Sequence, residues 1–158
     1  MNALIRPSLQ QLQPYSSARN EFSETASIYL DANENPFPSN YNRYPDPLQR
    51  ILKEKIAAVK GVKTDQLFLG NGSDEAIDLL IRAFCEPTKD SILVTEPTYG
   101  MYRVCAEVNN VKVISVKLTI DFDLDIDALN KGVDKTVKII FLCSPNNPTG
   151  NLLPKDKI

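Results

Sequence analysis

From Gln66 onward, the chain alternates short runs of β-branched and aliphatic residues with segments that repeat apolar residues at helical spacing. This alternation limits the available folds most strongly, because successive strand–helix–strand units predict a mostly parallel sheet with right-handed crossovers and flanking helices. We therefore expect an α/β fold. The expected strands are residues 66–69, 92–95, 111–116 and 137–142, and the expected helices are residues 73–85, 99–108 and 126–131.

The last strand lies in Thr136–Gly150, whose apolar run suits a strand buried on both faces of a parallel sheet. The segment Asn147-Pro148-Thr149-Gly150 follows it with the residue order of a type I turn. We expect the Asn147 carboxamide to be held beyond the carboxyl end of a core strand, where open α/β sheets bind ligands. A surface turn without a ligand explains the same residues about equally well.

Two other strand ends carry polar or aromatic residues. Gly70-Asn71-Gly72-Ser73-Asp74-Glu75 places Ser73 as the N-cap of a helix, and such a helix start suits a phosphate, although it also needs no ligand to be stable. Tyr99 lies between Pro97 and Gly100 and either stacks on a flat heterocycle or fills a corner of the fold. A phosphate site, an aromatic face and a carboxamide together suit a phosphorylated aromatic cofactor. The third glycine of a dinucleotide fingerprint and the lysine of a P-loop are absent, so neither of those nucleotide sites is expected.

Composition excludes several classes of function. The net charge of -2 argues against nucleic acid or an anionic membrane as the main partner. The 158 residues contain no histidine, which excludes Ser-His and Cys-His nucleophile pairs and His-ligated metals, and we expect no metal. Three cysteines without CxxC spacing suggest neither disulfides nor zinc, and we expect a cytoplasmic protein. No apolar segment is long enough to span a membrane.

The first part of the chain is irregular. Met1–Ser27 reads as a polar arm that needs another surface in order to be ordered. The prolines and short polar residues of Asp31–Pro38 predict a fixed loop. A helix is then expected with Asp46 as its cap and Pro47 at its first position, ending at Gly61.

Five motifs, in this order and spacing, resemble the fold-type I, pyridoxal-phosphate-dependent aminotransferases, specifically their histidinol-phosphate aminotransferase branch. They are Leu30–Pro36, Arg43–Asp46, Gly70–Glu75, Pro97–Tyr102 and Cys143–Gly150. The resemblance implies a N-terminal arm and substrate-side loop at residues 1–45 and a linking helix at 46–65. Residues 66–158 would be the first, truncated part of the large cofactor-binding α/β domain.

The resemblance also implies which residues bind the cofactor, pyridoxal 5′-phosphate. The helix start with Gly72, Ser73 and Asp74 would hold the cofactor phosphate. Tyr99 would stack on the pyridine ring, and Asn147 would hydrogen-bond its phenolic oxygen. Each of these roles agrees with the chemistry expected from the residues themselves.

Three further residues belong to the first part of the chain. Tyr44 resembles the tyrosine that reaches the cofactor phosphate of the neighbouring subunit, which implies a homodimer. Tyr15 and Asn33 resemble residues that line the substrate entrance. If so, the dimer orders the polar arm.

One feature of the family has no match in these residues. Its Schiff-base lysine is expected beyond Ile158, since Lys155 and Lys157 lack the serine-rich context of that lysine and read as solvated charges. We therefore expect no catalytic residue within the 158 residues and no transaminase activity from them alone. Such a chain would be the first half of a longer enzyme and would leave unpaired sheet edges.

The implied reaction of the longer enzyme is amino transfer between histidinol phosphate and 2-oxoglutarate, giving imidazole acetol phosphate and glutamate in histidine biosynthesis. Its partners would be a phosphorylated amine and a 2-oxo acid. One alternative keeps the cofactor and changes the substrate, as in other aminotransferases or threonine-phosphate decarboxylases. Another is a non-catalytic fragment that binds a phosphorylated ligand or pairs with a partner chain.

Overall fold

The computed structural model describes residues 4–22, 24 and 26–158, so the expectations for residues 1–3, 23 and 25 of the arm lie outside the described residues. The chain divides into two compact units. The first contains residues up to Gln11 together with Gly70–Ile158, and the second is Leu12–Leu69. The candidate site residues are therefore divided between two units.

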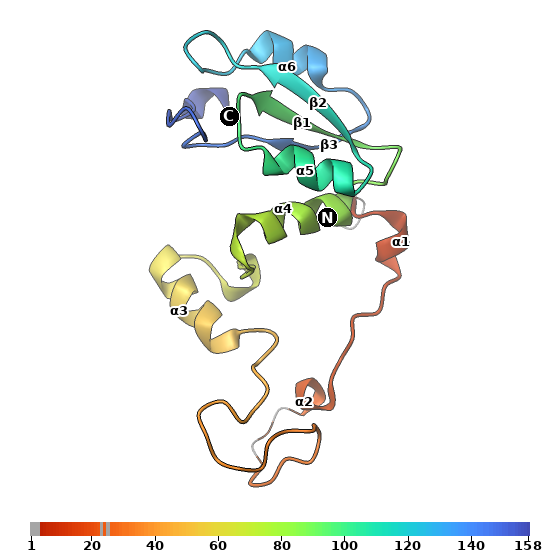
Figure 1. Ribbon diagram of the computed structural model, residues 1–158, viewed down its shortest axis with the longest axis vertical. Helices are drawn as coiled ribbons and strands as arrows, with labels where there is room; N and C mark the ends of the chain where they lie inside the picture. Colours follow the sequence, from red (N-terminus) through yellow and green to blue (C-terminus); the bar gives the residue numbers. More distant parts are fainter. Residues whose placement is uncertain (1–3, 23, 25) are drawn as a thin grey trace. The chain divides into compact units, whose positions relative to one another are not determined.

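The first unit is built on a three-stranded parallel sheet in the order β2-β1-β3 (Figure 1). Its strands are β1 (Ser91–Glu96), β2 (Lys112–Lys117) and β3 (Val137–Phe141). In the register, Ile92 of β1 lies opposite Val113 of β2 and Ile139 of β3. The predicted α/β fold with a mostly parallel sheet is confirmed.

Helices pack on both faces of this sheet. On one face lie α4 (Gly72–Phe84) and α5 (Met101–Val108), and on the other α6 (Ile126–Gly132), where Gly132 comes close to Leu93 and Val116 (Figure 1). Burying each large aliphatic side chain contributes about 1.5–3 kcal/mol, so this packing fixes the helices on the sheet. The buried core of the α4–α5 face consists of Ile77, Ile81, Cys85, Ile92, Val94, Cys105, Ala106 and Val111.

The strand buried on both faces is β1, and the prediction of that environment for β3 was wrong. In β1, all of residues 91–95 are buried. In β3, half-buried positions alternate with exposed ones, and Ile140 is 45% exposed. An apolar run alone does not distinguish a central strand from an edge strand, and β3 lies at the edge of the described sheet.

The predicted strand at residues 66–69 is also absent from the described structure. A 3₁₀ helix, η2 (Thr64–Gln66), occupies its start, and Leu67 then has extended backbone angles. A strand requires a hydrogen-bonded neighbour, and the sheet in the described part of the chain places none beside these residues. The sequence of residues 66–69 therefore favours an extended backbone but does not by itself produce hydrogen bonds to a neighbouring strand.

The second unit contains α2 (Ala18–Glu21), α3 (Arg50–Lys60) and η2. The start of α3 was predicted too early, because the backbone of residues 46–49 turns before the helix begins. Asp46 nevertheless acts as a local cap, since its carboxylate accepts the N–H groups of Leu48 and Arg50, both at 3.0 Å. The helix ends at Gly61, which has a left-handed backbone (φ 65°), as predicted.

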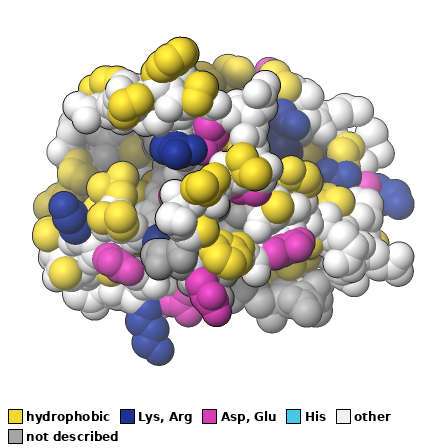
Figure 2. All heavy atoms as spheres, turned by 90° about the horizontal axis from the view of Figure 1, so that it is seen from below, with side chains coloured by type: hydrophobic (Ala, Val, Ile, Leu, Met, Phe, Trp, Pro, Cys, Tyr) yellow, Lys and Arg dark blue, Asp and Glu magenta, His cyan; other side chains and the backbone are white. Residues whose placement is uncertain are grey.

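Large apolar side chains are exposed in the second unit. Leu30 and Tyr41 are 93% and 94% exposed. Figure 2 shows one face of the molecule, on which hydrophobic side chains gather in several places between charged ones. No helix within the described residues is both long and apolar enough to cross a membrane.

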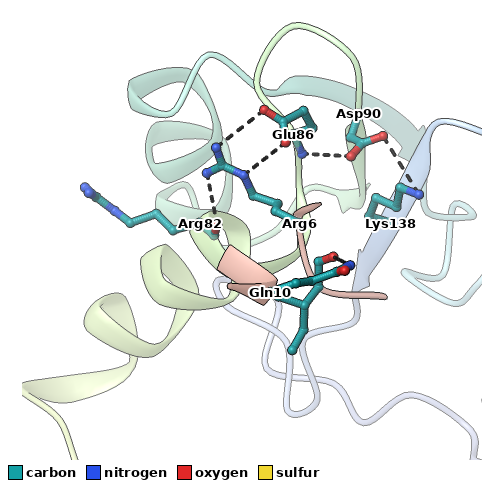
Figure 3. A network of polar contacts seen from close by, with 7 residues as sticks. Arg6, Gln10, Arg82, Glu86, Asp90 and Lys138 are labelled. Atoms are coloured by element: carbon teal, nitrogen blue, oxygen red, sulfur yellow. Dashed lines mark hydrogen bonds and ion pairs between the residues drawn. The ribbon is translucent and has the colours of Figure 1, made fainter. Parts of the chain in front are cut away.

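Residues 4–11 lie against the carboxyl end of α4 and include the short helix α1 (Pro7–Gln10). The Arg6 backbone N–H donates to Ala83 O at 3.0 Å. The Arg6 guanidinium donates to Arg82 O at 3.1 Å and pairs with Glu86 at 3.4 Å (Figure 3). A cation beside the last carbonyls of a helix is stabilising. Asp90 extends the network by accepting the Glu86 N–H at 2.7 Å (Figure 3). At the other end of the chain lies the 3₁₀ helix η3 (Lys155–Lys157).

Candidate functional site

The candidate site of the first unit lies beyond the carboxyl ends of β1 and β3. Because the two strands are parallel neighbours, the segments that follow them leave the same edge of the sheet. The segment after β1 carries Tyr99, and the segment after β3 carries Asn147. A side-chain contact joins them, since the Thr98 hydroxyl donates to Asn146 Oδ1 at 3.0 Å.

Asn146 was not singled out by sequence reasoning, yet it is the buried member of the Asn-Asn pair, with 4% exposure. Its Nδ2 donates to Pro97 O at 2.9 Å and to the Thr149 hydroxyl at 2.8 Å. Asn147 is exposed, and its side chain has no hydrogen-bond partner in the described part of the chain. The Asn147 amide is therefore available to a ligand, while Asn146 holds the loop.

The turn that carries Asn147 differs from the predicted type I turn. Its closing bond runs from the Gly150 N–H to Asn146 O at 2.7 Å, across four residues, and the Asn146 N–H donates to Asn151 O at 2.9 Å. Gly150 has a φ of 75°, which glycine adopts without steric cost. A turn was predicted at the correct position in the sequence. The observed loop is wider than a type I turn, because its closing hydrogen bonds join Asn146 to Gly150 and Asn151.

Tyr99 contacts the start of α4, a second predicted part of the site. Its hydroxyl donates to Asp74 Oδ1 at 2.9 Å, and this hydrogen bond raises the pKa of Tyr99 above its ordinary value. The structure thus brings together Tyr99 and Asp74, which lie 25 residues apart in the sequence. This hydrogen bond is made by the hydroxyl and fixes the orientation of the Tyr99 ring. It does not occupy the face of the ring.

An aromatic row supports Tyr99 from the sheet. Tyr102 meets Tyr99 edge to face with ring centroids 5.8 Å apart, and it stacks on Phe141 at 4.7 Å. Burial raises the pKa of Tyr102 to about 12. Aromatic pairs of this kind add about 0.5–1.5 kcal/mol beyond burial, so the row anchors Tyr99 to β3. The three-residue spacing of Tyr102 from Tyr99 is a helical neighbour spacing only in the expected helix 99–108, and α5 begins at Met101, after Tyr99.

The N-cap of α4 lies two residues earlier than predicted. Asn71 is its N-cap and Gly72, with a φ of 76°, is its first residue, so Ser73 lies in the first turn instead of capping it. Backbone N–H groups of a first turn have no intrahelical acceptor, and the helix dipole makes this end positive. Glu75 accepts the Asn71 N–H at 2.5 Å, while Asp74 accepts the Tyr99 hydroxyl. Both acidic side chains near the helix start are therefore engaged by donors of the chain itself.

A groove of 680 Å³ also opens at this edge of the sheet. Its charged side chains include Arg103, which donates to Glu96 Oε1 at 2.6 Å and to the Ser115 hydroxyl at 2.7 Å. The bond from Arg103 lowers the pKa of Glu96. Arg103 thus connects the ends of β1 and β2 through Glu96 and Ser115. Because its charge is already paired with Glu96, it is poorly suited to bind an anionic ligand.

The remaining three candidate residues lie together in the second unit. Tyr15 and Tyr44 line one pocket of 600 Å³, and the Tyr44 hydroxyl donates to Asn33 O at 3.4 Å. Glu34 holds this arrangement, since its carboxylate accepts the backbone N–H of Tyr44 at 2.9 Å and a guanidinium N–H of Arg43 at 2.6 Å. Within the second unit, these three candidate residues are thus connected with one another.

Comparison with known proteins adds an independent line of evidence. A sequence model of the family described as aminotransferase class I and II matches residues 19–158. The chain is 58% identical over 155 residues to a histidinol-phosphate aminotransferase of Parabacteroides distasonis, covering 98% of this chain and 45% of that protein. It is 56% identical over 162 residues to the histidinol-phosphate aminotransferase of Cytophaga hutchinsonii, covering 100% of this chain and 47% of that protein.

Solved structures show the same likeness. The histidinol-phosphate aminotransferase from Clostridium acetobutylicum superimposes with a TM-score of 0.64 at 31% identity, over 75% of this chain and 34% of that one. N-succinyldiaminopimelate aminotransferase from Mycobacterium tuberculosis gives a TM-score of 0.63 at 29% identity, over 75% and 33%. The chain therefore spans less than half the length of these relatives.

Proposed function

Because the chain belongs to the class I and II aminotransferase family, we propose that it forms part of an enzyme that transfers an amino group between histidinol phosphate and 2-oxoglutarate. The cofactor of this enzyme is pyridoxal 5′-phosphate. Two relatives named histidinol-phosphate aminotransferase support the choice of substrate, since each is more than half identical to this chain. The three free cysteines agree with a reducing, cytoplasmic location.

The observation that carries the proposal is the hydrogen bond between Tyr99 and Asp74. It joins an aromatic ring at a strand end to the first turn of a helix, and the bond between Thr98 and Asn146 adds the exposed Asn147 amide to the same edge. A phosphorylated pyridine needs these three kinds of group. The residues of this edge therefore fit the cofactor.

In the proposed site, the backbone N–H groups of Ser73 and Asp74, next to Gly72, hold the cofactor phosphate. Tyr99 stacks on the ring, and Asn147 donates to its phenolic oxygen. When bound, the cofactor supplies an electron sink for chemistry at the substrate's α-carbon. The chain's own residues bind and orient it. The Asp74 carboxylate would lie near the negatively charged cofactor phosphate. Its hydrogen bond from the Tyr99 hydroxyl gives this carboxylate a donor of the chain itself.

The residues of the second unit belong to the substrate side of the proposal. Tyr15 and Asn33 line the substrate entrance, and Tyr44 reaches the cofactor phosphate of the neighbouring subunit in a homodimer. The pocket shared by Tyr15 and Tyr44 supports their grouping. The proposal assigns the covalent bond to the cofactor to none of the 158 residues, so we expect no transamination from them alone.

Asn147→Ala in the complete enzyme tests the cofactor site. We expect its dissociation constant for pyridoxal 5′-phosphate to rise about 3- to 10-fold, the equivalent of one hydrogen bond. Asn130→Ala is a matched control, because Asn130 is an exposed asparagine on α6. Equal affinity in both variants would contradict the assignment of Asn147.

Substrate profiling tests the reaction. We expect amino transfer from histidinol phosphate to 2-oxoglutarate to be faster than transfer from unphosphorylated aromatic amino acids. Preference for an unphosphorylated amine would instead favour another aminotransferase. Release of carbon dioxide from threonine phosphate would favour a decarboxylase.

A further inference from the structure

Asn146 connects the two strand-end segments that carry the proposed ring-binding residues. We propose that Asn146 is a positioning residue, which holds Asn147 in a fixed place relative to Tyr99. This inference rests on the proposed function, because it assigns Asn146 a role through Asn147, a residue of the proposed cofactor site.

The side chain of Asn146 is bonded on both of its polar atoms. Its Oδ1 accepts the Thr98 hydroxyl at 3.0 Å, and its Nδ2 donates to Pro97 O at 2.9 Å and to the Thr149 hydroxyl at 2.8 Å. Two of these partners come from the segment after β1 and one from the loop itself. The carboxamide therefore fastens the loop after β3 to the segment after β1.

The backbone of Asn146 closes the same loop. Its carbonyl accepts the Gly150 N–H at 2.7 Å, and its N–H donates to Asn151 O at 2.9 Å. Asn151 in turn donates from Nδ2 to Phe122 O at 2.8 Å, which ties the loop to the segment after β2. Five hydrogen bonds thus converge on one residue that is 4% exposed.

The residues that Asn146 connects are neighbours in sequence of the proposed ring-binding residues. Thr98 directly precedes Tyr99, and Asn146 directly precedes Asn147. Consecutive Cα atoms are about 3.8 Å apart, so a bond between Thr98 and Asn146 limits how far Tyr99 and Asn147 can separate. Asn147 has no hydrogen bond of its own in the described structure, so its place depends on that of Asn146.

The chemistry requires an amide at position 146. An aspartate has nearly the same shape but no N–H donors, so it would face Pro97 O with a second acceptor. Because the site is buried, loss of these bonds is not made good by water. Asn146→Asp therefore releases the loop without removing side-chain volume.

A double-mutant cycle in the complete enzyme tests the inference. We expect Asn146→Asp to raise the dissociation constant for pyridoxal 5′-phosphate about 3- to 10-fold, as Asn147→Ala does. The double variant should bind within two-fold of Asn147→Ala, because Asn146 acts through the amide already removed. Asn130→Asp, a matched change on α6, should stay within two-fold of the parent.

The outcomes separate the two proposals. Unchanged affinity in Asn147→Ala would contradict the proposed function. A weaker Asn147→Ala together with an unchanged Asn146→Asp, or losses that multiply in the double variant, would overturn the positioning role.

A second variant and a second measurement cover the case in which Asn146→Asp fails to fold. Thr98→Val removes only the bond to Asn146 Oδ1 and should raise the dissociation constant about 2- to 4-fold. Amide hydrogen exchange of the cofactor-free protein should be faster at Gly150 in Thr98→Val than in the Asn130→Asp control. Unchanged exchange and unchanged affinity in Thr98→Val would overturn the inference.

Discussion

Gly132, the last residue of α6, tests how closely that helix packs on the sheet. We predict that Gly132→Ala destabilises the protein. A Cβ at this position would lie 3.0 Å from Val116 Cγ2 and 3.2 Å from Leu93 Cδ1. Ordinary carbon–carbon contacts are about 3.5–4.0 Å, so both neighbours would have to move away.

The magnitude follows from two opposing effects. Alanine is favoured over glycine in a helix by about 1 kcal/mol, and by less at a helix end. Leu93 is fully buried and Val116 is 7% exposed, so neither side chain has free space to retreat into, and overpacking costs about 1–3 kcal/mol. Overpacking wins, and we expect a net loss of about 0.5–2 kcal/mol. For a chain of this size, the melting temperature falls by about 2–6 °C.

Urea unfolding followed by circular dichroism measures this loss. Gly100→Ala is the control, because Gly100 has a φ of -65° and open space around its Cβ position. The control should be unchanged or up to about 1 kcal/mol more stable. Equal stability of the two alanine variants would refute close packing of α6 on the sheet.

Two further predictions concern the first unit. Arg6→Ala should lower the free energy of unfolding by about 1 kcal/mol, because it removes a cation from the carboxyl end of α4. Amide hydrogen exchange at residues 82–86 should become faster. Stability equal to that of the parent would contradict this role of Arg6. Burial raises the pKa of Cys85 from 9.0 to about 11, so the folded state keeps this proton longer than the unfolded state does, and stability should fall by roughly 1–2 kcal/mol between pH 8 and 10.5. Urea titrations at both pH values measure the fall, and Cys85→Ala should reduce it.

Much of the first unit could be predicted because its signals are local. The strands β1, β2 and β3 are marked by β-branched runs, and the helices between them by apolar spacing. The expected places of Tyr99 and Asn147 after β1 and β3 followed from topology, since the segments after parallel strands leave the same edge of the sheet. The hydrogen bond from Tyr99 to Asp74 did not follow from it, because the strand expected before α4 is absent from the described residues.

Other features depend on neighbours that a local pattern does not identify. The sequence of Val137–Phe141 is typical of a more deeply buried strand than that of Ser91–Glu96, yet in the sheet of the described residues only Ser91–Glu96 has a strand on each side. The sequence also does not distinguish the two asparagines at 146 and 147, because each is as polar as the other. Burial of Asn146 depends on Pro97 and Thr98, almost fifty residues earlier in the chain.

The contact of Arg6 with the end of α4 can form only after both ends of the segment 6–86 have been synthesised. Arg6 and Glu86 are separated by 80 residues, and synthesis proceeds at about 5–20 residues per second. Arg6 is therefore made about 4–16 s before its partner, long enough for a helix to form and melt many times. During that interval, the newly made segment has no place to bind on its own unit. The last turn of α4 completes the surface that residues 4–11 contact.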